Sequence, residues 1–247
     1  MNFTYLGLGL VLLILGLMLF FANRSQERPK RYLRDILAYI KLRRGIGLAV
    51  ESGRRLHITL GRGGIYGVQG GSTLIGLHLL QQIAQAASIS DRPPVATSGE
   101  ATQSVLSQDT LRDAYHSIGV DELFDPDSGQ LSGVTPFSYA AGTMPVIADQ
   151  QVSLNILAGH FGSEVALLTD AAEQSDGMSI AGSDNITAQA VMYASADESL
   201  VGEELYVAGA YVGSNPMHIA SLRAQDVVRW ILIGVILIGV GLKLLGF

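Results

Sequence analysis

His160 and Glu164 are the residues whose types and spacing point most directly to chemistry, because they stand at positions i and i+4. Such a pair could serve as a general acid and base or hold a metal ion. Ser98, Ser183 and Asp184 follow other apolar runs, and the two serines are candidate nucleophiles. No second histidine has ligand spacing, and neither serine stands in a GxSxG elbow. A capping or core role for His160 is the plainer alternative.

Small and polar residues follow several apolar runs, in the position where open α/β sheets bind ligands. Backbone N–H groups there could bind an anion, with Arg62 adding a charge. The alternative is that turns between strands and helices need glycine and capping residues regardless. The glycine spacing departs from GxGxxG and no Walker lysine follows, which argues against a dinucleotide fingerprint and excludes a P-loop. The candidate ligand-binding residues are Gly61, Arg62, Gly63, Gly64, Thr97, Ser98 and Gly99.

Asp125 and Asp127 resemble the beginning of a calcium loop, since they alternate and a glycine follows at position 129. The twelfth position of that loop is Pro136, where a bidentate glutamate would stand. A turn of Asp, Pro, Ser and Gly needs no ion. The chain has no cysteine, which excludes disulfides and thiol chemistry. We therefore expect no metal and no cofactor.

Short apolar runs that alternate with helical stretches must position these residues. The runs at 56–60, 94–97, 152–158 and 178–181 read as strands, with helices predicted at 72–87, 101–118, 163–174 and 186–196. Ser163 is a predicted N-cap. This alternation predicts an α/β domain with a mainly parallel sheet flanked by helices.

Three further segments complete the expected organisation. Residues 133–148 are irregular, with a further edge strand expected at 144–148, whereas 199–212 read as a helix. The small residues of 201–213 would give that helix a flat face for close packing between copies. The order Gly213, Ser214, Asn215, Pro216 predicts a stop followed by a new helix that continues to the chain end.

Both ends of the chain are apolar. Residues 3–22 form an uncharged run long enough to span a bilayer, and because the cations follow it, a retained anchor is favoured over a cleaved signal peptide. The second run, 230–242, reaches spanning length only if Arg229 and Lys243 extend to the headgroups, with Trp230 at the interface. A buried core helix is its alternative. The sequence predicts one transmembrane helix at each end.

Cations follow the first apolar run closely, which by the positive-inside rule predicts a cytoplasmic central domain with both termini outside. Residues 31–52 read as an amphipathic helix that either lies on anionic lipid or has a solvated face. The expected interface residues are Arg24, Arg28, Lys30, Arg31, Arg34, Arg229, Trp230 and Lys243. The predicted parts are 1–23 (first span), 24–52 (basic amphipathic helix), 53–215 (cytoplasmic domain) and 216–247 (connecting helix and second span).

The net charge of -6 is concentrated away from the ends, because no Lys or Arg occurs between Asp113 and Leu222. Phosphates would be repelled there, so we expect no nucleic acid partner. The acidic surface could face the basic segment of a neighbouring copy, or simply aid solubility. The expected partners are the lipid bilayer and further copies of this chain.

Five stretches carry a likeness to a known family: 49–61 (AVESGRRLHITLG), 93–99 (PPVATSG), 159–172 (GHFGSEVALLTDAA), 182–188 (GSDNITA) and 218–230 (HIASLRAQDVVRW). Together they resemble an uncharacterised prokaryotic family of doubly membrane-anchored α/β domains of unknown function. The resemblance implies the architecture and no activity.

Two functions fit these features. The first is a non-enzymatic scaffold that self-associates as a structural component of a membrane complex, since two anchors per subunit fix its orientation. The second is a domain that binds or converts a small molecule or anion at the strand ends. The mass of the detergent-extracted protein discriminates between them.

Overall fold

A computed structural model describes residues 3–25, 33–87, 90, 92–213 and 216–245. The described chain divides into two compact units, one of residues 35–212 and the other of 1–34 with 213–247. The helices are α1 (Phe3–Ser25), α2 (Leu37–Ser52), α3 (Gly70–Ala87), α4 (Ala101–Ser117), α5 (Pro136–Asp149), α6 (Val165–Gln174), α7 (Ile186–Ser195), α8 (Ala208–Tyr211) and α9 (Pro216–Leu244).

A six-stranded, wholly parallel sheet forms the centre of the larger unit, in the order β3-β2-β1-β4-β5-β6. The strands are β1 (Arg55–Gly61), β2 (Val95–Ser98), β3 (Gly129–Leu131), β4 (Val152–His160), β5 (Met178–Ser183) and β6 (Glu198–Leu200). The predicted parallel α/β sheet is thus confirmed. This strand order is that of doubly wound folds, in which the order of the strands reverses between β1 and β4: β2 and β3 lie on one side of β1, and β4, β5 and β6 on the other.

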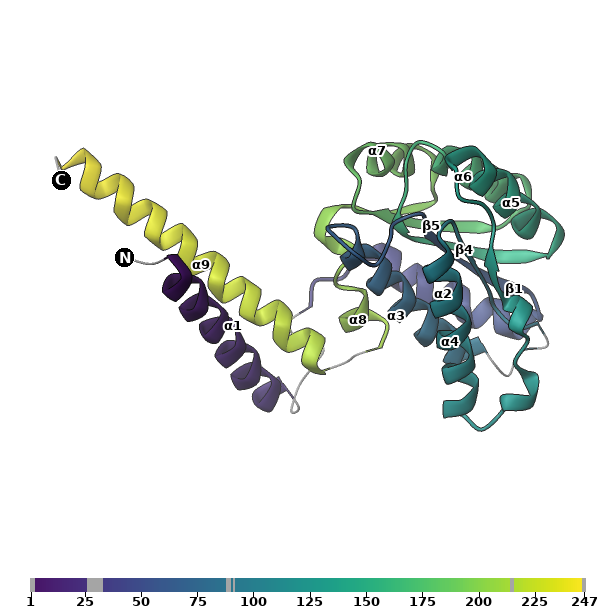
Figure 1. Ribbon diagram of the computed structural model, residues 1–247, viewed down its shortest axis with the longest axis horizontal. Coiled ribbons are helices and arrows are strands. Elements are labelled where there is room, and N and C mark those ends of the chain that lie inside the picture. Colours follow the sequence, from purple (N-terminus) through teal and green to yellow (C-terminus); the bar gives the residue numbers. More distant parts are fainter. Residues whose placement is uncertain (1–2, 26–32, 88–89, 91, 214–215, 246–247) are drawn as a thin grey trace. The chain divides into compact units, whose positions relative to one another are not determined.

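Helices cover both faces of the sheet (Figure 1). One core joins α2, α3 and α4 to the side chains of Leu56, Ile58 and Leu60, which alternate along β1. The other core joins α5, α6 and α7 to Leu157 and Ala181. Because every strand is parallel, all carboxyl ends lie at one edge of the sheet, called the carboxyl edge below.

Two predicted elements are wrong. Residues 144–148 do not form an edge strand but lie in α5. Thr135 is the N-cap of α5, where it and Ser138 each accept a hydrogen bond from the other's backbone N–H, and Pro136 stands in the first turn. Residues 199–212 do not form one helix, because a short strand and Gly202 at φ 61° interrupt the segment. Short 3-10 turns also occur at Asp121–Leu123, Pro126–Ser128 and Gly202–Glu204.

The predicted association surface at 201–213 is also corrected, because Ala208, Gly209 and Ala210 are buried in α8. Small residues there pack inside the domain and offer no flat face to another copy. The helix predicted at 31–52 is shorter in its described part, because α2 begins at Leu37, residues 34–36 are not helical and Ile36 is extended and enters the core; Arg31 lies outside the described residues. Glu164, not Ser163, occupies the N-cap position of α6, and it makes no side-chain cap bond.

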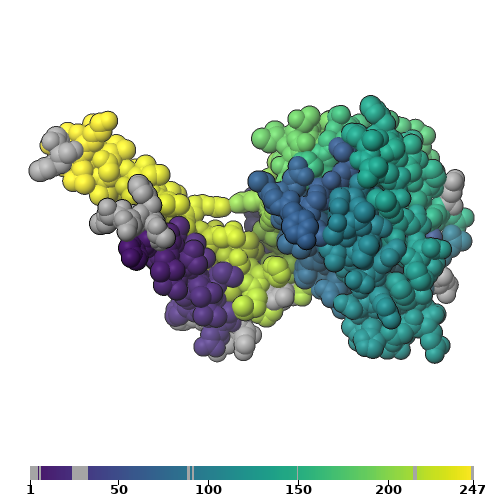
Figure 2. All heavy atoms as spheres, viewed as in Figure 1, coloured from purple at the N-terminus to yellow at the C-terminus, as the bar shows by residue number. Residues whose placement is uncertain are grey.

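The smaller unit pairs helices α1 and α9 side by side (Figures 1 and 2). Helix α9 runs without a break from Pro216 to Leu244, as the stop and cap signals predicted, and is long and apolar enough to cross a membrane. Within α1 the apolar stretch Gly7–Asn23 is shorter. The side chains of Trp230 and Arg229 are exposed.

Candidate functional site

The carboxyl edge collects most of the residues that the sequence singled out. Gly61 ends β1, Ser98 ends β2, His160 ends β4 and Ser183 ends β5. The strand order places β2, β1, β4 and β5 side by side. Their exits therefore surround the point between β1 and β4 where doubly wound proteins bind ligands.

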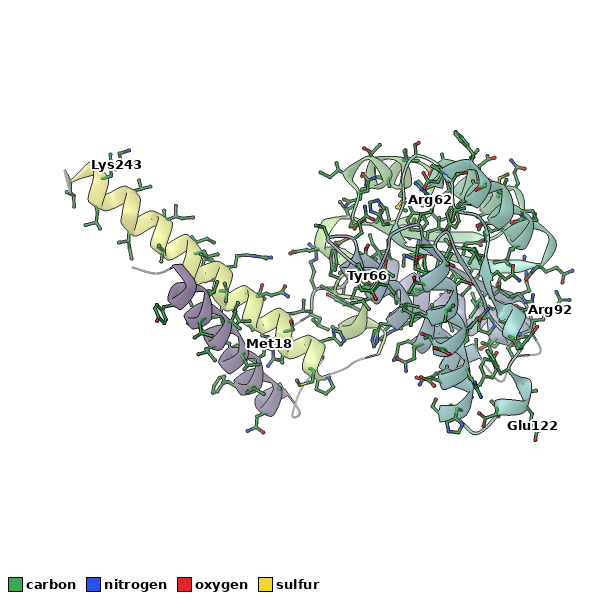
Figure 3. All side chains as sticks on the ribbon, viewed as in Figure 1. Met18, Arg62, Tyr66, Arg92, Glu122 and Lys243 are labelled. Carbon is green, nitrogen blue, oxygen red and sulfur yellow. The ribbon has the colours of Figure 1, made fainter. Side chains whose placement is uncertain are left out.

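An ion pair between Arg62 and Glu164 crosses this point, with Arg62 Nε 2.8 Å from Glu164 Oε1. The arginine stem lies over Gly99, where an added Cβ would come within 2.3 Å of its Cγ. Only 3% of the Glu164 side chain and 23% of the Arg62 side chain are exposed. The side chain of Arg62, which Figure 3 labels, thus links the exits of β1, β2 and β4.

The charge of Arg62 is already matched by this carboxylate. Burial by itself would raise the pKa of Glu164, but hydrogen bonds from Arg62 and from the backbone N–H of Gly162 outweigh it and lower the pKa. Glu164 is therefore ionised at neutral pH. An anion at this point would have to displace it from Arg62.

A second pair joins His160 to Asp184, with His160 Nδ1 2.7 Å from Asp184 Oδ1. The other carboxylate oxygen, Oδ2, accepts a hydrogen bond from Ser72 Oγ at 3.0 Å. Ser72 stands in the first turn of α3, where free N–H groups favour an anion. The protein places its own carboxylate there. His160 and Glu164 therefore have different partners and do not form one metal or acid–base pair.

The two candidate serines have structural hydrogen bonds and are fully buried. Ser98 Oγ donates to the carbonyl of Gln130, which fixes β2 to β3. Ser183 Oγ accepts from the N–H groups of Phe161 and Asn185, both at 3.2 Å. Neither hydroxyl has a hydrogen bond to a histidine or carboxylate among the residues that the structure describes, so neither is activated as a nucleophile.

The glycine loop after β1 is packed tightly. Gly61 has φ 73°, and a Cβ there would lie 2.2 Å from the carbonyl oxygen of His160. The carbonyl of Gly63 accepts hydrogen bonds from Thr73 Oγ1 and from the Gln103 side-chain amide. These glycines are needed for close approach of the backbone, in agreement with the turn-chemistry alternative.

A buried polar layer beneath this edge was missed from the sequence. His57 Nδ1 donates to Asn155 Oδ1 at 3.0 Å and its Nε2 accepts from Thr97 Oγ1 at 2.9 Å, so one imidazole joins β4, β1 and β2. Burial lowers the pKa of His57 to about 4, against a raising contribution from Asn155. Thr59 and Tyr139 form a further hydroxyl pair on the same face. Helix α5 covers this face, since its Tyr139 meets Thr59. The alternation in Leu-His-Ile-Thr-Leu is that of a half-exposed strand, so it gives no signal of a buried polar layer.

The candidate calcium residues form a turn. Asp125 Oδ1 accepts from the backbone N–H of Asp127 at 2.9 Å, which caps the 3-10 turn at 126–128. Within the described ranges, no group of three or more His, Asp and Glu residues is placed to hold a metal ion.

Large exposed apolar side chains surround the carboxyl edge. Tyr66 and Val68, in the loop after β1, are 90% and 99% exposed. Val134 and Phe137 follow β3, and Ile186 follows β5 with 82% of its surface exposed. Such side chains, when gathered on one side of a domain, mark interaction surfaces. We call Tyr66, Val68, Val134, Phe137 and Ile186 the apolar rim.

Among the predicted membrane-interface residues, Arg28, Lys30 and Arg31 lie outside the described residues. Arg34 is exposed, and Arg229 Nη1 lies 3.8 Å from Asp226 Oδ1. Arg24 and Lys243 belong to α1 and α9.

A comparison with protein families matches residues 4–247 to a domain of unknown function (DUF6754). The match covers nearly the whole chain, including both terminal helices. The protein belongs to this family of uncharacterised domains, as the resemblance of the five stretches indicated. Neither the curated proteins nor the solved structures that were searched contain a match.

Proposed function

We infer that this protein is a membrane-anchored scaffold whose domains associate with one another through the carboxyl edge. In this proposal both α1 and α9 span the same bilayer, the domain is cytoplasmic and the termini are outside. The observation that carries the proposal is that side chains paired with one another, Arg62 with Glu164 and His160 with Asp184, occupy the ligand position of the fold, whereas the apolar rim around it is exposed.

The antiparallel pairing of α1 with α9 supports two spans (Figure 1). Two apolar helices that lie side by side and antiparallel fit one bilayer, because the chain crosses it in one direction in α1 and in the opposite direction in α9. Both termini then lie on the same side of the membrane. The cations that follow α1, together with Arg223 and Arg229 in the first half of α9, favour the cytoplasmic side for the domain. With both ends of the domain anchored, copies meet in one orientation, and self-association then takes a closed symmetric form.

The mass of the full chain in a gentle detergent tests this proposal. We expect the wild type to have a mass that is a multiple of the monomer mass. The double variant Phe137→Lys with Ile186→Lys should be monomeric, because each lysine would have to be buried in an apolar contact without a counter-charge. Tyr193→Lys is the matched control, since Tyr193 is 75% exposed but lies near the far end of α7. A monomeric wild type contradicts the proposal.

A second candidate function is binding of a small anion between β1 and β4, which the strand order favours. Arg62 would then exchange Glu164 for the ligand. A thermal-shift screen with nucleotides and small anions tests it, since a ligand at 100 times its Kd stabilises by about 2.7 kcal/mol. Stabilisation that Arg62→Ala removes would favour this function over the scaffold.

A further inference from the structure

A pocket of about 520 Å³ opens at the other edge of the sheet, between α2 and the beginnings of β4 and β5. That volume is within the range of about 300 to 1,000 Å³ for small-molecule sites. The lining residues are Lys41, Arg44, Gly45, Leu48, Ala49, Ser52, Arg54, Ser153 and Met178. None of the residues discussed at the carboxyl edge takes part.

The lining of the pocket carries positive charge only. Lys41, Arg44 and Arg54 contribute three cations, and no Asp or Glu is among the lining residues. Lys41 is paired with Glu198, with its Nζ 2.5 Å from Oε1. Arg54 donates to the carbonyl of Val152 at 3.3 Å, and Arg44 has no ion pair among the described residues. Two guanidinium groups are thus available for an anion with several oxygen acceptors.

The rest of the lining is apolar. Leu48 lines the pocket, and 54% of its surface is exposed. Ala49 and Met178 complete the apolar surface. Gly45 permits this close packing, because a Cβ there would lie 3.0 Å from Met178 Cε. Ser153, a further lining residue, has a hydroxyl oxygen that is shielded from solvent and has no hydrogen-bond partner among the described residues.

We propose that this pocket binds one anionic phospholipid, with the phosphate at Arg44 and Arg54 and the beginning of an acyl chain against Leu48, Ala49 and Met178. Charge complementarity favours an anionic headgroup, because in a zwitterionic lipid the headgroup cation offsets the phosphate and is itself repelled by the cations of the lining. The apolar surface requires an amphiphile, which free phosphate is not. The chain also carries a helix able to cross a bilayer, so the bilayer is the nearest source of such a molecule. This inference is independent of the proposed self-association.

The absence of cysteine permits a single reporter in the full chain. Ser52→Cys carries a bimane fluorophore at the pocket, and the protein in a neutral detergent is titrated with phosphatidylglycerol that has brominated acyl chains. We expect saturable quenching, with phosphatidylcholine of the same chains at least tenfold weaker. Arg44→Ala combined with Arg54→Ala should weaken the apparent affinity about 25-fold, because the loss of each cation weakens it about fivefold. Arg112→Ala, an exposed arginine on α4, should change nothing.

Two further measurements separate this site from other sources of the signal. A reporter at Val105→Cys, exposed on α4, should show no preference between the two lipids. Native mass spectrometry, which needs no label, should find one retained phosphatidylglycerol that the double arginine variant loses. The proposal is overturned by equal quenching with both lipids, by full affinity in the double variant, or by displacement of the lipid by inorganic phosphate alone at millimolar concentration.

Discussion

Arg62 Nε lies 2.8 Å from Glu164 Oε1, although 102 positions separate the two residues in the sequence. The pair joins the loop after β1 to the beginning of α6, across the place where the strand order of a doubly wound fold reverses. In proteins that bind ligands there, the corresponding space is open to the ligand. Here a buried carboxylate and the stem of an arginine occupy it.

Replacement of Glu164 by Gln tests the contribution of this pair. The substitution leaves the mostly buried Arg62 without its counter-charge, so we expect a loss of about 2 kcal/mol, or about 4 to 8 °C in Tm. Thermal unfolding of the full chain in detergent measures it. Glu122→Gln, in the 3-10 turn at 121–123, is the control and should leave Tm unchanged. An unchanged Tm in Glu164→Gln would contradict a stabilising contribution of the Arg62–Glu164 pair.

The same variant has a predictable pH dependence. The pKa of Glu164 is lowered in the folded protein, so its contribution is present above the unfolded value of 4.5 and is lost as pH falls through the folded value. The difference in stability between wild type and Glu164→Gln should therefore shrink in acid. A difference that grows on acidification contradicts this assignment.

His57 should make the protein acid-sensitive at a higher pH. Its pKa is about 4 in the folded protein and 6.5 when unfolded, so the unfolded chain binds the proton first. Stability is complete above pH 6.5 and falls by about 3 kcal/mol as the pH decreases to about 4. Denaturant unfolding at a series of pH values measures the slope.

The control for this prediction is a second histidine. In His57→Asn the decrease between pH 6.5 and 4 should become smaller, whatever the change in stability at neutral pH. His116→Gln is the matched control, because it removes an imidazole whose side chain is 78% exposed. Equal slopes in wild type and His57→Asn would show that the buried imidazole is not the group that titrates.

Two glycines within helices should respond oppositely to alanine. Gly76 lies in α3 against β4, where a Cβ would be 2.4 Å from the carbonyl oxygen of Ala158, so Gly76→Ala should cost about 1 to 3 kcal/mol. Gly47 lies in α2 with no atom within 4 Å of its Cβ position, so Gly47→Ala should stabilise by up to about 1 kcal/mol. Chemical denaturation compares the two, and a stabilising Gly76→Ala would contradict the packing of α3 on the sheet.

The orientation in the membrane can be tested with single cysteines. Val105→Cys in the domain should react with a membrane-impermeant maleimide only after cell lysis, whereas Lys243→Cys near the end of α9 should react in intact cells. The reason is that cations beside a span remain on the cytoplasmic side. Labelling of Val105→Cys in intact cells would reverse the proposed topology.

The long elements of the fold could be predicted from the sequence. The apolar runs that became β1, β2, β4 and β5 are central strands with continuous burial. By contrast, β3 and β6 have three residues each at the edges of the sheet, too few to show alternation. Helix α5 was missed because glycine, proline and small polar residues weaken its helical pattern, although Thr135 and Pro136 gave a start signal.

The candidate site was predictable in position but not in pairing. Parallel strands bring their exits together, so His160 and Asp184 were expected at one edge. Which carboxylate pairs with His160 and which with Arg62 depends on packing between side chains that are 24 and 102 positions apart in the sequence. Periodicity does not determine such packing. For this reason His160 was grouped with Glu164, its neighbour in sequence, and not with Asp184.

Disulfide crosslinking in native membranes tests the association through the apolar rim most directly, because no detergent intervenes and the chain has no cysteine of its own. Phe137→Cys, in the rim, is oxidised in parallel with Tyr193→Cys, which is equally exposed but lies away from the carboxyl edge. We predict a covalent dimer for Phe137→Cys and monomers for Tyr193→Cys. Monomers in both, or dimers of equal yield in both, would contradict the scaffold proposal.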